Sequence, residues 1–161
     1  MSNIKLGLGP VSLQKSLLVG VHIRGGDMQS EESKSRGYKV PHQSYYLKAI
    51  IYFLVKFKSV HFLVISDDRK YCKTIMDPVP KALYTLYGDI SASTGPLEDL
   101  TAMSVCDHVI GSVGTYSWWW AAWLAGGQVV MFNSSVLLNS QVGYGFNKDD
   151  YFPVEWHLMG N

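Results

Sequence analysis

The chain has 161 residues, of which 47% are hydrophobic and 17% are charged, and its formal net charge is +1. This length fits one compact domain with a buried core, and the composition excludes an intrinsically disordered chain. No long run of like charges occurs, which argues against a polyanion-binding arm and so against a nucleic-acid partner. Two cysteines exclude a disulfide-dense scaffold and a four-cysteine zinc site.

Hydrophobic patterning predicts a first strand and a first long helix. Residues 17–23 are an apolar, β-branched run that is typical of a strand buried on both faces. The polar residues 28–40 that follow predict a mobile loop. Pro41 can open a helix. The expected buried face of this helix carries apolar residues at helical spacing, namely Leu47, Ile50, Ile51, Leu54 and Val55.

Two further strands and a helix are predicted in the middle of the chain. Residues 61–65 predict a buried strand, and Ser66 and Asp67 after it are typical of a helix N-cap. Residues 82–87 predict a weaker strand, and residues 96–106 predict a helix.

The remaining elements complete an α/β pattern. Residues 109–110 predict a short strand, and Thr115 or Ser117 would cap a tryptophan-rich helix that ends at glycines 126–127. Residues 128–132 predict the last strand. This alternation predicts a single α/β domain with a doubly wound, Rossmann-like parallel sheet.

No stretch of the sequence is suited to crossing a membrane. The densest apolar stretch, residues 118–132, is 15 residues long, and glycines 126–127 interrupt it. A membrane-spanning helix needs about 20 mostly apolar residues. We therefore expect a buried helix and a buried strand here, and a soluble chain.

The end of the first predicted strand carries polar residues suited to a ligand. In doubly wound sheets, ligands bind beyond the carboxyl ends of the strands. His22 and Arg24 share one side of the strand if it stays extended, and Gly25 and Gly26 would let a ligand approach the backbone. An arginine at this place suits a phosphate group. The alternative is an Arg24–Asp27 ion pair that closes a turn.

A second candidate anion site follows the strand at 109–110. Residues 111–117 combine glycines and hydroxyl side chains ahead of a helix, whose amides and dipole favour an anion. No P-loop or dinucleotide-binding glycine motif occurs, which gives ATP hydrolysis and nicotinamide binding little support. Asp67 and Asp68 lack the spacing of a metal-dependent sugar-transferase motif, and a helix cap explains at least one of them.

Tryptophans and cysteines permit more than one interpretation. The tryptophans of residues 118–123 are expected in the core rather than stacked on a sugar. Cys72 and Cys106 could form a disulfide, remain buried as thiols or be free, and spacing does not decide among these.

Four segments of the chain, in order, carry a family resemblance. They are Val-Gly-Val-His-Ile-Arg-Gly-Gly-Asp at 19–27, the strand and Ser-Asp-Asp at 62–72, the run from Asp99 to Gly127, and Tyr-Phe-Pro with Trp156 at 151–156. Together they resemble the α-1,2-fucosyltransferases, and within them the animal galactoside 2-α-L-fucosyltransferases. The first motif of that family usually has two adjacent arginines, and here Gly25 takes the second place.

The resemblance implies an enzyme with a fold of the two-lobed GT-B type. It would transfer L-fucose from GDP-fucose to a terminal β-galactoside in α-1,2 linkage, with inversion, without a metal and without another cofactor. The chain would be the C-terminal, donor-binding lobe, and residues 1–16 would be the remnant of, or linker from, an N-terminal lobe. Relatives in animals are type II Golgi proteins, which implies a lumenal location and a membrane anchor outside this chain.

The resemblance also implies roles for individual residues. His22 and Asp99 would contact the guanine base, while Arg24 and the helix start at Thr115 and Ser117 would meet the charge of the diphosphate. Gly26 would belong to the donor site, and Asp27 is a candidate general base. Residues 31–32, both glutamates, are weaker candidates for the same role. Because Gly25 replaces an arginine, a catalytically impaired protein that binds GDP-fucose or a glycan is the alternative.

Overall fold

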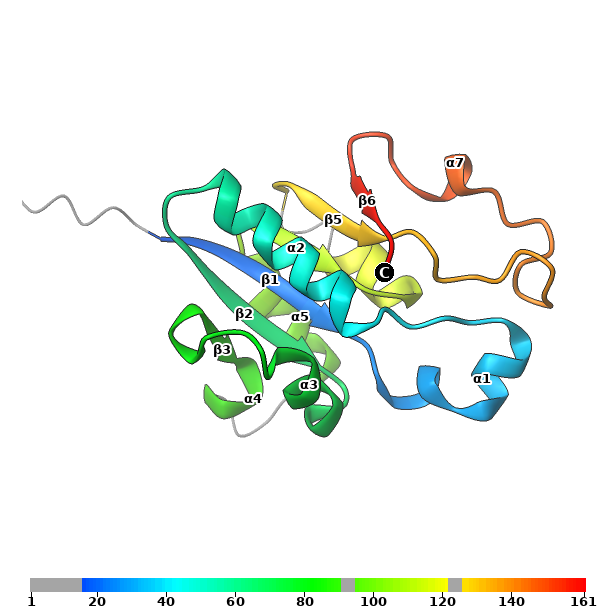
Figure 1. Ribbon diagram of the computed structural model, residues 1–161, viewed down its shortest axis with the longest axis horizontal. Helices are drawn as coiled ribbons and strands as arrows, with labels where there is room; N and C mark the ends of the chain where they lie inside the picture. Colours follow the sequence, from blue (N-terminus) through cyan, green and yellow to red (C-terminus); the bar gives the residue numbers. More distant parts are fainter. Residues whose placement is uncertain (1–15, 91–94, 122–125) are drawn as a thin grey trace, which may run out of the picture.

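The computed structural model describes residues 16–90, 95–121 and 126–161, and for residues 89–90 and 119–121 it describes the backbone alone (Figure 1). Within these residues, one six-stranded, all-parallel sheet has the order β3-β2-β1-β4-β5-β6. The strands are β1 (Leu17–Ile23), β2 (Val60–Ser66), β3 (Tyr84–Leu86), β4 (His108–Gly111), β5 (Val129–Phe132) and β6 (His157–Met159). The predicted doubly wound α/β fold is confirmed.

Helices connect the strands. The α-helices are α1 (Glu31–Arg36), α2 (Gln43–Lys56), α3 (Arg69–Met76), α4 (Tyr87–Ile90), α5 (Pro96–Ser104) and α7 (Lys148–Tyr151). Two 3-10 turns, η1 (Gly26–Gln29) and η2 (Lys81–Leu83), and a π-helical segment, η3 (Tyr116–Ala121), complete the helical elements of the described residues.

Helices cover both faces of the sheet, as Figure 1 shows for α2 in front of β1 and α5 behind it. The alternate residues Val19, Val21 and Ile23 of β1 pack in one large cluster with buried side chains of α2 and α3. Leu63 and Ile65 of β2 point to the opposite face, where they pack with the buried residues of α5. Because side chains alternate along a strand, β1 and β2 place residues in both layers.

The buried face of α2 differs from the prediction. Its buried side chains are Tyr45, Tyr46, Ala49, Ile50 and Phe53. Of the predicted set, Ile51 and Val55 are 57% and 82% exposed. The two tyrosines decide the orientation of the helix, because their rings fill the space over the sheet and Ile51 and Val55 then lie on the outer side.

The prediction of a loop at 28–40 is wrong for most of this segment, which is helical. This segment forms the end of η1 and the helix α1, which Ser30 caps by accepting the Ser33 N–H at 3.1 Å. Gly37 ends the helix with a φ of 104°, a left-handed conformation that suits glycine. Short helices of polar residues lack an apolar stripe, so periodicity does not reveal them.

The other predicted elements agree with the structure to within a few residues, except for the tryptophan-rich helix. Its segment Tyr116–Ala121 is π-helical, and residues 122–125 lie outside the described residues. Besides α1, five elements of the structure were not predicted, namely η1, η2, α4, α7 and β6. Each has only three or four residues, too few to show a hydrophobic period. The predicted N-terminal remnant or linker at 1–16 lies, except for Ser16, outside the described residues and stays a prediction.

The hydroxyl of Tyr45 joins α2 to the sheet. It donates to the carbonyl of Gly111 at 2.5 Å and lies 3.3 Å from the carbonyl of Val130. The side chain is fully buried. The bond therefore fixes the central helix against the ends of β4 and β5 without access of water.

We predict that Tyr45→Phe lowers the free energy of unfolding by about 1–2 kcal/mol, because it leaves a buried carbonyl without its donor. Urea denaturation measures this change. Tyr144→Phe is the matched control, since Tyr144 is 94% exposed and its hydroxyl faces solvent. Equal stability of the wild type and Tyr45→Phe would show that the buried bond contributes nothing net.

Candidate functional site

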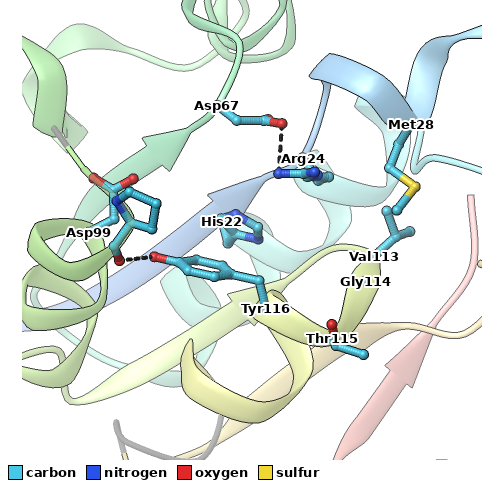
Figure 2. A pocket seen from close by; sticks show the side chains of 10 residues that line it. His22, Arg24, Met28, Asp67, Asp99, Val113, Gly114, Thr115 and Tyr116 are labelled. Atoms are coloured by element: carbon cyan, nitrogen blue, oxygen red, sulfur yellow. Dashed lines mark hydrogen bonds and ion pairs between the residues drawn. The ribbon is translucent and has the colours of Figure 1, made fainter.

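A cavity of about 340 Å³ opens at the carboxyl ends of β1, β2 and β4 (Figure 2). Its lining comes from the end of β1, from the segments that follow β1, β2 and β4, and from the start of α5. The lining residues are His22, Arg24, Met28, Asp67, Pro96, Asp99, Val113, Gly114, Thr115 and Tyr116. The chain leaves β1 towards β2 and β3 on one side and returns to β4 on the other side. The cavity therefore lies at the topological switch point, where doubly wound sheets bind ligands.

His22 and Arg24 line the same cavity, as the extended strand predicted. His22 is 3% exposed, and its Nδ1 lies 3.2 Å from the hydroxyl oxygen of Ser112. Its ring centroid is 5.3 Å from that of Tyr116. Burial, reinforced by the charge of Arg24, lowers the pKa of His22 to about 4. The imidazole is therefore neutral at pH 7 and offers hydrogen bonds rather than charge.

Arg24 is held by two carboxylates. Its Nη2 lies 2.6 Å from Oδ1 of Asp27, and its Nη1 lies 2.9 Å from Oδ2 of Asp67. Figure 2 shows the guanidinium facing Asp67. The structure thus contains the Arg24–Asp27 ion pair that was the alternative to a ligand contact. The side chain nevertheless lines the cavity and is 28% exposed.

The two adjacent aspartates after β2 have separate roles. Asp68 caps α3, because its carboxylate accepts the N–H of Tyr71 at 2.9 Å. Asp67, which the sequence presented as a cap, lines the cavity and accepts the N–H of Gly25 at 2.8 Å. The sequence contained a partial signal for this role, since one cap needs one aspartate and two adjacent aspartates follow the strand.

Asp99 lies on the opposite wall, in the first turn of α5. Its Oδ1 is buried and has no hydrogen-bond partner among the described residues. Burial raises the pKa of Asp99, and the nearby charges of Glu98 and Asp67 raise it further. Beside it, the hydroxyl of Tyr116 donates to the carbonyl of Pro96 at 2.7 Å. Asp99 therefore presents an acceptor that a donor group on a ligand could satisfy.

The loop after β4 contributes backbone and small side chains. Gly114, with a φ of 86°, and Thr115 line the cavity. Ser117 does not, because its side chain is buried and its oxygen accepts the N–H of Ser112 at 2.8 Å. The hydroxyl of Ser112 in turn contacts His22 and accepts the N–H of Arg24 at 3.2 Å. Ser117 therefore contacts these two cavity residues only indirectly, through Ser112.

Gly25, Gly26 and Asp27 follow Arg24 but do not line the cavity. A Cβ on Gly25 would lie 2.8 Å from Cδ1 of Tyr71 and 2.9 Å from Cβ of Asp68. A Cβ on Gly26 would lie 2.5 Å from Oδ2 of Asp67, and Gly26 has a φ of 32°. Both glycines are thus required by close packing of the chain on itself, and the side chain of Asp27 is 66% exposed.

Trp118 is a core residue, and the two cysteines are buried thiols. Trp118 packs with Val129, Met131 and Phe152, and its indole N–H donates to the carbonyl of Tyr151 at 2.7 Å. It is a core residue, and the side chains of the other tryptophans of 118–123 lie outside the described residues. Cys72 and Cys106 are buried free thiols, and burial raises their pKa to about 11 and about 12.

Within residues 16–90, 95–121 and 126–161, no three His, Cys, Asp or Glu side chains cluster as a metal site would require. In the same part of the chain, no helix combines the length and apolar character needed to span a membrane.

Sequence comparison assigns the family. Residues 2–159 match the family described as Glycosyl transferase family 11. The chain belongs to this family. Its motifs at 19–27 and 99–127, which carried the resemblance, supply five of the cavity's polar side chains, namely His22, Arg24, Asp99, Thr115 and Tyr116. The family 11 assignment thus agrees with a site at the carboxyl ends of the strands.

Curated relatives of this family 11 chain are considerably longer. The chain is 31% identical to galactoside alpha-(1,2)-fucosyltransferase 1 of Mus musculus over 157 residues, which cover 94% of this chain and 39% of the relative. The corresponding Homo sapiens protein is 31% identical over 153 residues, which cover 94% of this chain and 41% of the relative. The chain therefore spans about two fifths of their length. No solved structure matches it significantly.

We predict that the neutral, buried His22 makes stability depend on pH. Its pKa of about 4 in the folded chain lies below the usual histidine value of 6.5, so between these values the unfolded chain binds a proton that the folded chain does not. The free energy of unfolding should fall by up to about 3 kcal/mol as the pH decreases from about 6.5 to 4, with no further loss from this group below pH 4.

Urea denaturation of the wild type and His22→Asn at several pH values measures this contribution. The difference in unfolding free energy between the two proteins should change across the window, because all other titrating groups are common to both. A difference that stays constant from pH 7 to pH 4 would contradict the predicted role of His22.

Proposed function

We propose that the chain binds GDP-fucose and transfers its L-fucose to a terminal β-galactoside in α-1,2 linkage. Membership of glycosyl transferase family 11 supports sugar transfer, and the names of the relatives support fucose and a galactoside acceptor. The observation that carries the proposal is the cavity itself, since it brings together one arginine, one buried histidine and one unsatisfied carboxylate at the switch point.

In this proposal the guanine base binds between His22 and Asp99. Guanine presents two adjacent donors, N1–H and N2–H, and Asp99 has a buried carboxylate oxygen without a partner among the described residues. His22 lines the same cavity and is neutral, so it can bond the base without repelling or attracting charge. Binding of guanine would thus satisfy a polar atom that is costly to leave unpaired.

The diphosphate would lie at Arg24, with the backbone of Thr115 near it. Gly26 would act indirectly, because its lack of a side chain leaves space for the Asp67 carboxylate that contacts Arg24. A guanidinium suits phosphate because it donates two parallel hydrogen bonds. Ser117 would act through Ser112, since its hydroxyl accepts the Ser112 N–H. No metal and no additional cofactor is part of the proposal, so fixed donors would meet the charge that develops on the leaving group.

The reaction would be a single displacement with inversion. The oxygen of an acceptor hydroxyl forms a bond to C1 of fucose while the bond between C1 and the β-phosphate oxygen breaks. The electron pair of that bond leaves with GDP, and the proton of the hydroxyl goes to a general base. Asp27 is the proposed base, because its exposed carboxylate lies beside Arg24 at the edge of the cavity.

We further propose that the chain is the donor-binding part of a Golgi-lumenal enzyme of the GT-B type. The length of the relatives supports this, since the chain covers 39–41% of them. A galactose-terminated glycan would then contact both this chain and a further lobe.

A second candidate function is donor or glycan binding without transfer. The specific observation in its favour is the charge around Arg24, which two carboxylates already neutralise, together with Gly25, where the family motif usually provides a second arginine.

Two assays separate these functions. Calorimetric titration with GDP, GDP-fucose, UDP and ADP tests binding, and we expect the guanine nucleotides alone to bind. Transfer of radiolabelled fucose from GDP-fucose to a terminal β-galactoside then tests catalysis. Binding of GDP-fucose without transfer would support the second function. Absence of GDP binding would contradict the proposed transfer and would leave glycan binding as the only form of the second function.

We predict that Arg24→Ala weakens GDP binding at least tenfold, because charge-assisted bonds of an arginine contribute about 1.5–3 kcal/mol each. The melting temperature should change little, since the side chain is partly exposed and its pair with Asp27 is near solvent. Arg36→Ala, on the exposed helix α1, is the control. Unchanged GDP affinity in the calorimeter would remove Arg24 from the site.

We predict that Asp99→Asn reduces the preference for GDP over ADP at least tenfold. The amide keeps one acceptor oxygen, but its NH2 group takes the place of the other and presents donors towards the N–H groups of guanine. Competitive titration of the two nucleotides measures the ratio. A preference equal to that of the wild type would place the base elsewhere in the cavity.

A further inference from the structure

The two carboxylates on Arg24 differ in how firmly they are held. We propose that Asp67 is a positioning residue that keeps the guanidinium at the cavity, and that Asp27 is a replaceable counter-ion which the donor's diphosphate displaces. This inference rests on the proposed function, because it concerns how GDP-fucose enters the same site.

Asp67 is fixed by its surroundings. One carboxylate oxygen accepts the N–H of Gly25 at 2.8 Å, and the other lies 2.9 Å from Nη1 of Arg24. The space for this second oxygen exists because Gly26 has no side chain, since a Cβ there would come within 2.5 Å of it. The backbone at Gly25 and Gly26 thus lies directly against this carboxylate, and the side chain of Asp67 is only 27% exposed.

The carboxylate of Asp27 is held less firmly than that of Asp67. Its side chain is 66% exposed and projects from the four-residue turn η1. Its carboxylate contacts Nη2 of Arg24 at 2.6 Å, and it does not line the cavity. Releasing this carboxylate returns it to water with little rearrangement of the protein.

The free energies favour exchange at Asp27. An exposed ion pair contributes about 0–1 kcal/mol, so breaking the Arg24–Asp27 pair costs little. A phosphate group gains more from the same guanidinium inside a partly enclosed site, because its bonds to arginine are charge-assisted and bidentate. Displacing Asp67 would also leave the Gly25 N–H without its acceptor.

Charge at the guanidinium favours the departure of one carboxylate. Arg24 is the only cation among the side chains that line the cavity in the described part of the chain. While both Asp27 and Asp67 pair with it, the two carboxylates outweigh its single positive charge. Departure of Asp27 leaves Arg24 balanced by Asp67 alone and frees Nη2 for the phosphate oxygens.

The test measures the affinity of three variants for GDP and for guanosine, which lacks the diphosphate. Asp27→Asn should bind GDP about three to ten times more tightly than the wild type, because the neutral amide competes poorly for Arg24. Asp67→Asn should bind GDP at least ten times more weakly, because Arg24 loses the anion that orients it. Guanosine affinity should be unchanged in both.

Asp149→Asn is the matched control, because Asp149 is an exposed aspartate on α7 whose loss changes the net charge equally. Its affinities for both ligands should equal those of the wild type. The guanosine titration separates positioning from damage to the fold, since a collapsed cavity would weaken both ligands. If Asp67→Asn does not fold, the GDP affinity of Asp27→Asn still shows whether Asp27 competes with the diphosphate, because this substitution is at an exposed side chain.

The outcomes distinguish this inference from the proposed function. If the wild type binds GDP but Asp27→Asn binds it equally or more weakly, the exchange is overturned while the donor site stands. If Asp67→Asn binds GDP as tightly as the wild type, the positioning role is overturned. If the wild type does not bind GDP, the proposed function and this inference both fail.

Discussion

The parallel pairing of β1 with β2 and β4 is the constraint on which the site depends. β1 pairs with β2 along all seven of its residues and with β4 from Val19 to Val21, so three loops emerge together at one end of the sheet. His22 and Arg24 come from the first loop and strand end, Asp67 from the second and Thr115 from the third. Residues separated by more than 90 positions thereby share one small cavity.

Electrostatics in this cavity are set by burial as much as by charge. Burial keeps His22 neutral and raises the pKa of Asp99, while Arg24 retains its charge between two carboxylates. The polar groups thus fall into two zones. One contains an uncharged ring and an unpaired acceptor, which suit a heterocyclic base, and the other contains the cation, which suits an anion.

Much of the fold could be predicted from sequence because the long elements carry strong patterns. Residues 17–23 and 61–65 are continuous apolar runs, and they form the adjacent strands β1 and β2. The face of α2 could not be predicted, since apolar residues surround the helix and only the size of Tyr45 and Tyr46 selects the buried side. Elements of three or four residues, such as β6, have no period to detect.

The candidate site was predicted in part, because only some of its residues are placed by local sequence pattern. His22 and Arg24 could be placed together because alternation along one strand is a local property. Asp67 was assigned to a helix cap, because its contact with Arg24 and Gly25 depends on strand order, which the sequence pattern does not specify. Whether Ser117 faces ligand or protein depends on the same long-range packing, and its hydroxyl faces Ser112.

The packing around Gly25 limits the routes by which this motif could change. Tyr71 and Asp68 occupy the space that any side chain at position 25 would need, so a second arginine there requires simultaneous alteration of its neighbours. No single codon change could therefore add a second guanidinium at this position without disturbing the cap of α3. A change at Gly25 would thus be felt in the first turn of α3, where Asp68 accepts the N–H of Tyr71.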